Sequence, residues 1–309
     1  MNVKSRAFAG AVVGAAALGL SVMAPVASAD PAPGVYRVLA GVGSDTTEDV
    51  LSGLGNDVDG GSLIASYDAT IYGSAKIKTR AAGCEIDRPN DSSAGITALN
   101  NDIDSKTGCL DFARSSRGPQ NWGPNLTWIP FATDKLTMAV RQDSLLNDSD
   151  GLDLTVTQLR SIYACTLTQL NHTTLEPKLP PSGSGLRTVF LNMIGNPTLG
   201  SCVGTTQASD GKALDTVGDI APYSVAKWIS QTRGLIEDLH GDTVLGTIDG
   251  GQYSFPVYNV VSTAKLTDPT IAATFVGSGS KVCQATATIT RFSFGTASDC
   301  GDVFLKGEN

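Results

Sequence analysis

Apolar and polar residues alternate along the chain in blocks whose lengths suit strands and helices. Residues 35–40 form an apolar run, and a short polar stretch that contains Gly41 and Gly43 follows it. Residues 46–54 then place apolar side chains at helical spacing. Because glycine permits tight turns and short polar residues begin helices, the pattern predicts a strand, a turn and a helix.

The same alternation continues to the end of the chain. Further predicted strands cover residues 63–67, 109–113, 126–131, 136–140, 219–221, 244–248 and 255–261. Further predicted helices cover residues 91–99, 155–163, 186–194, 210–217, 225–231, 269–276 and 283–290. Strands that alternate with helices at this spacing predict an α/β fold with parallel strands.

The first 29 residues have the pattern of an export signal. Lys4 and Arg6 precede an apolar run over residues 7–22, and residues 27–29 read Ala-Ser-Ala, a small-residue cleavage site. No cysteine stands at this site for lipid attachment. We therefore expect a secreted, extracytoplasmic protein without an anchor, whose mature chain begins at Asp30.

The net charge of the chain limits the classes of partner that it can bind. The formal net charge is −8, and without Lys4 and Arg6 it becomes −10. An acidic chain with no basic run is poorly suited to bind nucleic acid. Its field would also repel anions, so an anion-binding site would have to work through local hydrogen-bond donors.

Six cysteines follow the predicted cleavage site, and an even number in an exported protein indicates disulfides. Many pairings are possible, and we expect neighbours to pair because the cysteines fall as three separated pairs. The expected disulfides are Cys84–Cys109, Cys165–Cys202 and Cys283–Cys300. A metal site would need C-x-x-C spacing or clustered histidines. The chain has only His172 and His240, so we predict neither a metal nor a cofactor.

Four polar loops share one chemistry. They cover residues 44–47, 91–95, 114–117 and 182–188, each at a predicted strand end or helix start. Ligands of open α/β sheets bind at the carboxyl ends of strands, where hydroxyls, free N–H groups and arginines can surround an oxyanion. Glycine–serine turns are also common in ordinary loops, and surface arginine ion pairs contribute little. Only the four loops together therefore indicate a site.

The order of these motifs resembles that of phosphate-type substrate-binding proteins of ABC transporters, which have the periplasmic binding protein type 2 fold. The resemblance spans nearly all of the chain after residue 29. The matching segments are Gly41-Val-Gly-Ser-Asp-Thr46, Asp91-Ser-Ser-Ala-Gly95, Asp111-Phe-Ala-Arg-Ser-Ser116, Ile129-Pro-Phe-Ala-Thr-Asp134, residues 154–163, Ser182-Gly-Ser-Gly185 and Phe255-Pro-Val-Tyr-Asn259.

The resemblance implies two lobes, each a mixed sheet flanked by helices, that are joined by two hinge crossovers. The first lobe would hold residues 30–132 and 256–309, and the second would hold residues 133–255. The crossovers would lie near residues 132–134 and 254–258, and an anion between the lobes would close them. The resemblance also implies a monomer that captures phosphate without catalysis and delivers it to an ABC permease.

The four loops supply the predicted site. The predicted ligand-binding residues are Ser44, Asp45, Thr46, Thr47, Ser92, Ser93, Arg114, Ser115, Ser116, Ser184, Gly185, Arg187 and Thr188. Among these, the resemblance assigns residues 44–46 and Ser92 to the anion loops of the first lobe. It assigns Ser184 and Gly185 to a clamp in the second lobe.

Two departures from the family pattern bear on the identity of the anion. The family usually ends its Asp-Phe-x-x-Ser motif with a carboxylate that accepts the proton of hydrogen phosphate, but this chain has Ser116 there. A carboxylate acceptor favours phosphate over sulfate, which carries no proton, and Asp45 could supply it. The chain also lacks the family's arginine before the clamp, so Arg187 is the replacement candidate, with Arg114 and Arg117 as alternatives. Phosphate is the first choice, and sulfate or another anion stays open.

Two other functions compete with capture of an anion for uptake. A secreted serine hydrolase would need a nucleophile elbow, and no Gly-x-Ser-x-Gly occurs in the chain. His172 and His240 also lack the context of a catalytic triad. A secreted protein without an anchor could instead scavenge an anion or act at a surface, and the sequence does not separate this role from uptake.

Overall fold

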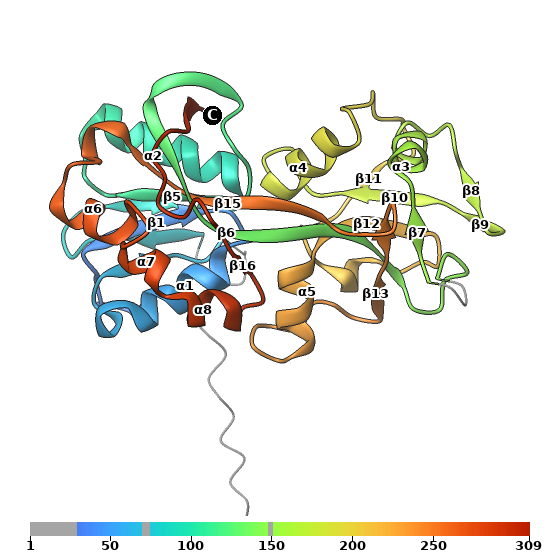
Figure 1. The fold of residues 1–309 in the computed structure, drawn as a ribbon, viewed down its shortest axis with the longest axis horizontal. Helices are drawn as coiled ribbons and strands as arrows, with labels where there is room; N and C mark the ends of the chain where they lie inside the picture. Colours follow the sequence, from blue (N-terminus) through green and yellow to red (C-terminus); the bar gives the residue numbers. More distant parts are fainter. Residues whose placement is uncertain (1–29, 70–74, 148–150) are drawn as a thin grey trace, which may run out of the picture.

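The computed structural model describes residues 30–69, 75–147 and 151–309 (Figure 1). The predicted export signal over residues 1–29 lies outside these residues. Figure 1 shows two lobes side by side, connected by two long strands. Each lobe combines part of a sheet with helices, as the sequence predicted.

Eleven strands of the described chain form one sheet. They are β1 (Leu39–Gly43), β2 (Ile64–Ser66), β5 (Phe112–Ser115), β6 (Asn121–Arg141), β10 (Glu176–Leu179), β11 (Gly204–Thr205), β12 (Asp219–Ser224), β13 (Thr243–Leu245), β15 (Tyr253–Ser262), β16 (Gly295–Thr296) and β17 (Lys306–Glu308). The main path runs β11-β10-β12-β6-β15-β5-β1-β2, and the other three strands pair with β6. β1 is parallel to β2 and β5, but β15 is antiparallel to β5 and β6. The sheet is therefore mixed.

Three two-stranded pairs lie outside this sheet. They are β3 (Lys76–Lys78) with β4 (Glu85–Asp87), β7 (Asp153–Leu154) with β14 (Thr247–Ile248), and β8 (Gln169–Leu170) with β9 (Thr173–Thr174). The helices of the first lobe are α1 (Glu48–Asp57), α2 (Ser92–Ser105), α6 (Pro269–Phe275), α7 (Lys281–Gln284) and α8 (Thr286–Arg291). The helices of the second lobe are α3 (Val156–Tyr163), α4 (Gly185–Met193) and α5 (Val225–Thr232).

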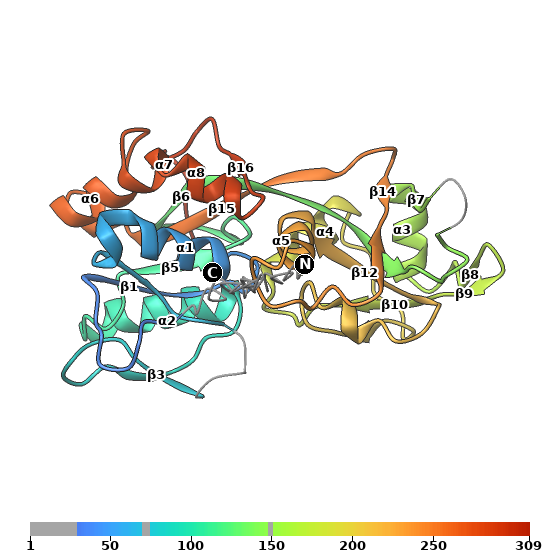
Figure 2. The ribbon, with the colours of Figure 1, turned by 90° about the horizontal axis from the view of Figure 1, so that it is seen from below.

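The two long strands β6 and β15 run antiparallel through both lobes (Figures 1 and 2). Their pairing extends from Tyr253 opposite Leu136 to Ser262 opposite Leu126. The sequence predicted two strands over residues 126–131 and 136–140, but β6 is continuous. The polar residues between them are paired as well, because β15 lies alongside. The predicted lobe boundaries fall within this paired region, and they stay predictions.

The core is built on both faces of the first-lobe sheet. Successive residues of a strand face opposite sides, and accordingly Phe112 and Ala113 of β5 belong to different hydrophobic clusters. Phe112 packs in one cluster with Leu51 of α1, and Ala113 packs in the other with Ile96 of α2. The polar end of β5 therefore lies between α1 and α2.

Four further predicted elements differ from the structure, and one of them is the strand predicted over residues 244–248, which is divided into β13 and β14. The strand predicted over residues 35–40 begins only at Leu39, because Val35 and Val38 are exposed. The helix predicted over residues 210–217 is a single 3-10 turn, Gly211–Ala213. The helix predicted over residues 283–290 is divided into α7 and α8.

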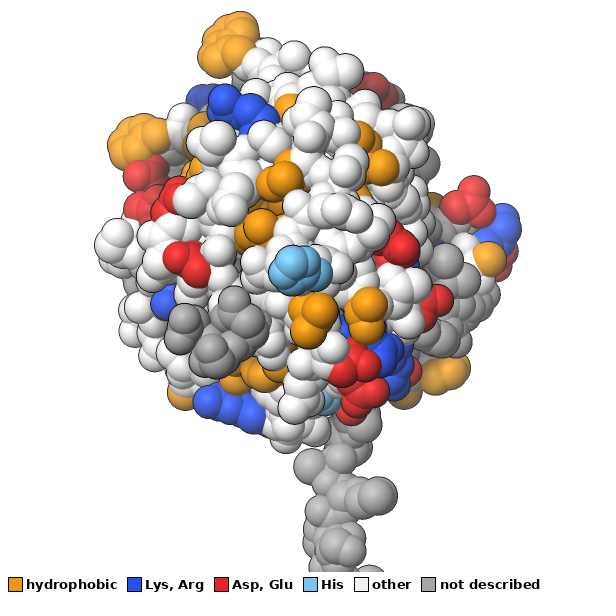
Figure 3. Space-filling view, turned by 90° about the vertical axis from the view of Figure 1, so that its right-hand side faces the viewer, with side chains coloured by type: hydrophobic (Ala, Val, Ile, Leu, Met, Phe, Trp, Pro, Cys, Tyr) orange, Lys and Arg blue, Asp and Glu red, His pale blue; other side chains and the backbone are white. Residues whose placement is uncertain are grey.

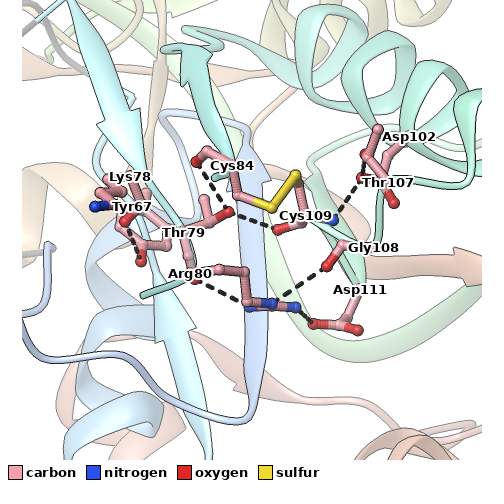
Figure 4. Close-up of a disulfide and its surroundings, with 10 residues drawn as sticks. All are labelled: Tyr67, Lys78, Thr79, Arg80, Cys84, Asp102, Thr107, Gly108, Cys109 and Asp111. Atoms are coloured by element: carbon pink, nitrogen blue, oxygen red, sulfur yellow. Dashed lines mark hydrogen bonds and ion pairs between the residues drawn. A yellow bond between two sulfur atoms is a disulfide. The ribbon is translucent and has the colours of Figure 1, made fainter. Parts of the chain in front are cut away.

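The structure joins the six cysteines as sequence neighbours, in the pairs Cys84–Cys109, Cys165–Cys202 and Cys283–Cys300. The first disulfide ties the β3–β4 hairpin to the start of β5 (Figure 4). Thr79 Oγ1 donates to the carbonyl of Cys109 at 2.7 Å, and the Cys109 amide donates to Asp102 Oδ1 at 2.7 Å. The chain that enters β5 is therefore fixed at the end of α2.

Candidate anion-binding site

The loop after β1 turns sharply into α1. Gly43 has a φ of +122°, and a Cβ built on it would lie 2.6 Å from the carbonyl oxygen of Arg114, so only glycine fits. The Ser44 amide donates to the same carbonyl at 3.1 Å. Thr47 is the N-cap of α1 but makes no cap hydrogen bond, and its buried hydroxyl has no partner in the described part of the chain. α1 therefore begins with donors that no side chain satisfies.

Three serines from separate loops meet at this helix start. Ser44 Oγ donates to Ser116 Oγ at 3.1 Å, and Ser92 Oγ lies 3.4 Å from Ser116 Oγ. The Ser116 amide also donates to Ser92 Oγ at 3.2 Å. All three serines are fully buried. The structure thus brings together the three polar loops of the first lobe.

The fourth loop comes from the second lobe and reaches the same serines. A Cβ built on Gly185 would lie 2.3 Å from Ser116 Oγ and 2.5 Å from Ser92 Oγ. The Ser93 amide donates to the carbonyl of Gly183 at 3.2 Å, which joins the lobes directly. α4 accordingly starts opposite the start of α2 (Figure 1).

Arg114 joins the strands beneath the site. Its Nε donates to the carbonyl of Ser44 at 3.2 Å, its Nη1 to Ser66 Oγ at 2.8 Å, and its Nη2 to the carbonyl of Gly43 at 3.0 Å. The side chain is fully buried, and burial lowers the pKa of its guanidinium. Three of the five N–H groups of Arg114 thus hold the loop after β1 in place, and its role in binding a ligand stays a prediction.

Arg117 has one buried N–H group that remains available as a hydrogen-bond donor. Its Nη1 donates to the carbonyl of Gly118 at 2.9 Å, and its Nη2 donates to Ser93 Oγ at 2.9 Å and to the side-chain oxygen of Asn309. Its Nε is buried and has no partner among the described residues. Ser115 Oγ donates to the Arg117 carbonyl at 2.7 Å and shapes the turn. Burial also lowers the pKa of Arg117.

The predicted clamp residues of the second lobe shape the start of α4. Ser184 is the N-cap, and its hydroxyl accepts from the Arg187 amide at 3.5 Å. Arg187 Nη1 donates to the carbonyl of Pro180 at 2.8 Å. Thr188 Oγ1 donates to the Ser184 carbonyl at 3.2 Å. Arg187 therefore folds back onto its own lobe.

Asp45 is the carboxylate of the first loop. Its Oδ1 accepts from the amide of Thr46 at 2.8 Å and lies 3.4 Å from the Thr46 hydroxyl. Burial raises the pKa of Asp45 to about 6, although the charge of Lys227 and the Thr46 amide oppose this shift. The side chain is consequently ionised at neutral pH and becomes neutral in mild acid.

The sequence prediction missed the cation beside this loop. Lys227 lies in the first turn of α5, and its Nζ donates to the backbone carbonyl of Asp45 at 3.1 Å. It also forms ion pairs with Glu48 at 3.1 Å and Asp49 at 2.7 Å. A lysine in the first turn opposes the helix dipole. That unfavourable placement was the signal in the sequence that it has a partner elsewhere.

Residues 30–69, 75–147 and 151–309 contain no group of three His, Cys, Asp or Glu side chains arranged to hold a metal. None of the helices described is long and apolar enough to cross a membrane. A hollow of about 330 Å³ at the outer end of the second lobe is lined by Leu145, His172 and Val217 among others. The surface there mixes charges of both signs with uncharged groups (Figure 3).

Comparison with known proteins rests on structure alone, since no family model and no curated protein matches the sequence. A putative phosphate ABC transporter substrate-binding protein from Clostridium perfringens, solved with bound phosphate, superposes with a TM-score of 0.59 at 14% identity. The match covers 84% of this chain and 99% of that one. An ABC-type phosphate transport receptor from Vibrio cholerae gives a TM-score of 0.54 at 14% identity, over 84% of this chain and 100% of that one.

The fold is that of a periplasmic binding protein. This agrees with the fold that the order of the sequence motifs predicted. In such a two-lobed fold, the loops at residues 44–47, 92–93, 116 and 184–185 lie where the lobes meet. Their role as ligand-binding residues stays a prediction.

Proposed function

We propose that this chain is an extracytoplasmic solute-binding protein that captures an inorganic oxyanion between its lobes. Phosphate is the expected ligand, and an ABC permease is the expected recipient. The protein binds and releases its ligand as a monomer without chemical conversion. The structural likeness to phosphate-binding proteins supports this assignment.

The observation that carries the proposal is the meeting of polar loops from both lobes. Ser44, Ser92 and Ser116 lie together against Gly185 of the second lobe. Thr47 Oγ1 and Arg117 Nε are buried donors that the described chain leaves unpaired. Free amides at helix starts and unpaired buried donors suit an anion. They can also offset the repulsion that a negatively charged protein exerts.

Calorimetry on the mature, ligand-stripped protein tests the proposal. Phosphate should release or absorb heat with saturation, while small carboxylates should not. A titration with sulfate distinguishes two kinds of site. A general oxyanion site should bind sulfate and phosphate alike, while a site that accepts the proton of hydrogen phosphate should bind phosphate more tightly. An absence of both heat and thermal shift at millimolar phosphate would remove phosphate from consideration.

Asp45 should make the preference between the two anions depend on pH. Above pH 6 its ionised carboxylate can accept a phosphate proton but repels sulfate. As the pH falls through about 6 the carboxyl becomes neutral, so sulfate affinity should rise by about tenfold or more while phosphate affinity falls. Titrations with both anions at pH 5 and pH 7.5 measure this.

Two variants check the origin of that pH dependence. Asp45→Asn should bind sulfate at pH 7.5 as the wild type does at pH 5. Asp104→Asn, which alters an exposed carboxylate on α2, should leave both profiles unchanged. Sulfate affinity that stays constant with pH in the wild type would show that Asp45 does not face the anion.

The arginine that contacts the anion should be Arg117. Removing its buried, unpaired Nε donor in Arg117→Ala should weaken phosphate binding by about ten- to a hundredfold, since a hydrogen bond to a charged group contributes about 1.5–3 kcal/mol. Arg187→Ala should change the affinity by less than about threefold, because Arg187 bonds to Pro180 in its own lobe. Calorimetry on both variants measures the two changes in affinity. A larger loss for Arg187→Ala than for Arg117→Ala would mean that Arg187 contacts the anion.

A scavenging protein that does not serve a permease is the second candidate. It would share the same anion site and the same binding data. Phosphate uptake by cells that lack the protein, with and without added mature protein, separates the two roles.

A further inference from the structure

Lys227 crosses from the second lobe into the first. It projects from α5, and all three acceptors that the structure gives its ammonium group lie in the first lobe. They are the Asp45 carbonyl at 3.1 Å, Glu48 Oε1 at 3.1 Å and Asp49 Oδ2 at 2.7 Å. A lysine has three N–H donors, so Lys227 is saturated and has none left for an anion.

The environment of Lys227 makes this contact strong. Only 8% of the residue is exposed, and Glu48 is 4% exposed. Burial by itself lowers the pKa of Lys227, but Asp49 and Glu48 outweigh it and raise the pKa. The second oxygen of Glu48 accepts from the Ala69 amide at 2.9 Å, which fixes that carboxylate. Breaking such a buried pair is costly because it leaves charges uncompensated.

Helix α5 makes a second contact with the first lobe. Ser230 Oγ of α5 donates to the carbonyl of Phe292, just after α8, at 2.9 Å. The Phe292 ring in turn packs against Gly53 of α1, where a Cβ would lie 2.2 Å from it. α5 therefore meets α1 and the segment after α8, on a different side of the site from α4 (Figures 1 and 2).

We infer that Lys227, Glu48 and Asp49 together hold the lobes closed through the protein's own charges. We call these three residues the latch. Its acceptors are protein groups, so it favours closure whether or not an anion is bound. It rests on the proposed function only for the identity of the ligand. Such a latch lowers the contribution that the ligand must make to closing and slows release of the bound anion.

Small-angle X-ray scattering on ligand-stripped protein tests the latch without any ligand. Lys227→Met should have a larger radius of gyration than the wild type, because the open state becomes populated. Lys178→Met is the matched control, because Lys178 pairs with Asp219 inside the second lobe at 2.8 Å. That variant should scatter like the wild type. Equal radii for Lys227→Met and the wild type would overturn the latch.

Two further measurements test the latch even if Lys227→Met does not fold or phosphate does not bind. Asp49→Asn removes one carboxylate on the more exposed side of the latch and should give an intermediate radius even if Lys227→Met fails to fold. In stopped-flow fluorescence, phosphate should leave Lys227→Met about tenfold faster or more, as expected when a buried charge pair is truncated. If no phosphate binds to the wild type, the proposed function fails while the scattering still judges the latch. An unchanged radius for Asp49→Asn together with unchanged release from a folded Lys227→Met would refute it.

Discussion

Gly185→Ala should weaken phosphate binding by about ten- to a hundredfold. The added Cβ would lie 2.3 Å from Ser116 Oγ and 2.5 Å from Ser92 Oγ, well inside van der Waals contact. Both serines are buried and already hydrogen-bonded to each other, so neither can move aside freely. The second lobe would have to retreat from the first. An overpacking cost of about 1–3 kcal/mol corresponds to a loss of about ten- to a hundredfold in affinity.

The effect should appear mainly in binding. The ligand-stripped variant relieves the clash by opening its lobes, so its thermal midpoint should fall only by the contribution of the latch, while alanine is favourable at the start of a helix. Gly251→Ala is the matched control, because a Cβ on that second-lobe glycine meets no atom within 4 Å. Wild-type phosphate affinity in Gly185→Ala would mean that the lobes do not need this close approach to bind the anion.

Helices with local start signals were predicted closely from the sequence. The helix predicted over residues 155–163 is α3, and Thr155 with Gln158 forms the capping box that starts it. Asp268 and Pro269 likewise start α6 at the predicted place. Such signals act within one turn of the helix, so a single sequence carries them.

Strand limits and lobe contacts depend on residues far apart in the sequence. Nothing near residues 132–135 shows that β6 continues through them, because its partner strand β15 follows more than a hundred residues later. The shared residue types and the order of the serine loops predicted that they meet, and the structure brings them together; their role in binding an anion stays a prediction. The acceptors of Lys227 could not be predicted, because they lie 178 to 182 positions away. Contacts between residues far apart in the sequence were therefore the part of the structure that the sequence did not predict.

Asp134→Ala should be the most destabilising single change near the hinge strands. Asp134 lies on β6 and is 2% exposed. Its carboxylate accepts from the hydroxyl of Ser224 and from the amide of Ala226 at 3.1 Å, at the start of α5. Alanine would leave both donors buried without an acceptor, which should lower the free energy of unfolding by about 2–4 kcal/mol. Urea unfolding of the ligand-stripped protein measures the change.

The control for this prediction is an ordinary helix cap. Asp268→Ala removes a carboxylate that accepts from the amides of Thr270 and Ile271, but Asp268 is exposed. It should cost about 1 kcal/mol. An equal cost for both variants would mean that burial of Asp134 adds nothing to its role.

The pH dependence of stability gives Asp134 a separate signature. Burial raises its pKa to about 6, although the Ser224 hydroxyl and the Ala226 amide oppose the shift. Between about pH 4 and pH 6 the folded protein therefore binds more protons than the unfolded chain, so stability falls as the pH rises through this window. Asp134→Asn cannot titrate and should make that decline shallower. Since α5 also carries Lys227, loosening its start should weaken the latch, and Asp134→Asn should then release phosphate faster than the wild type.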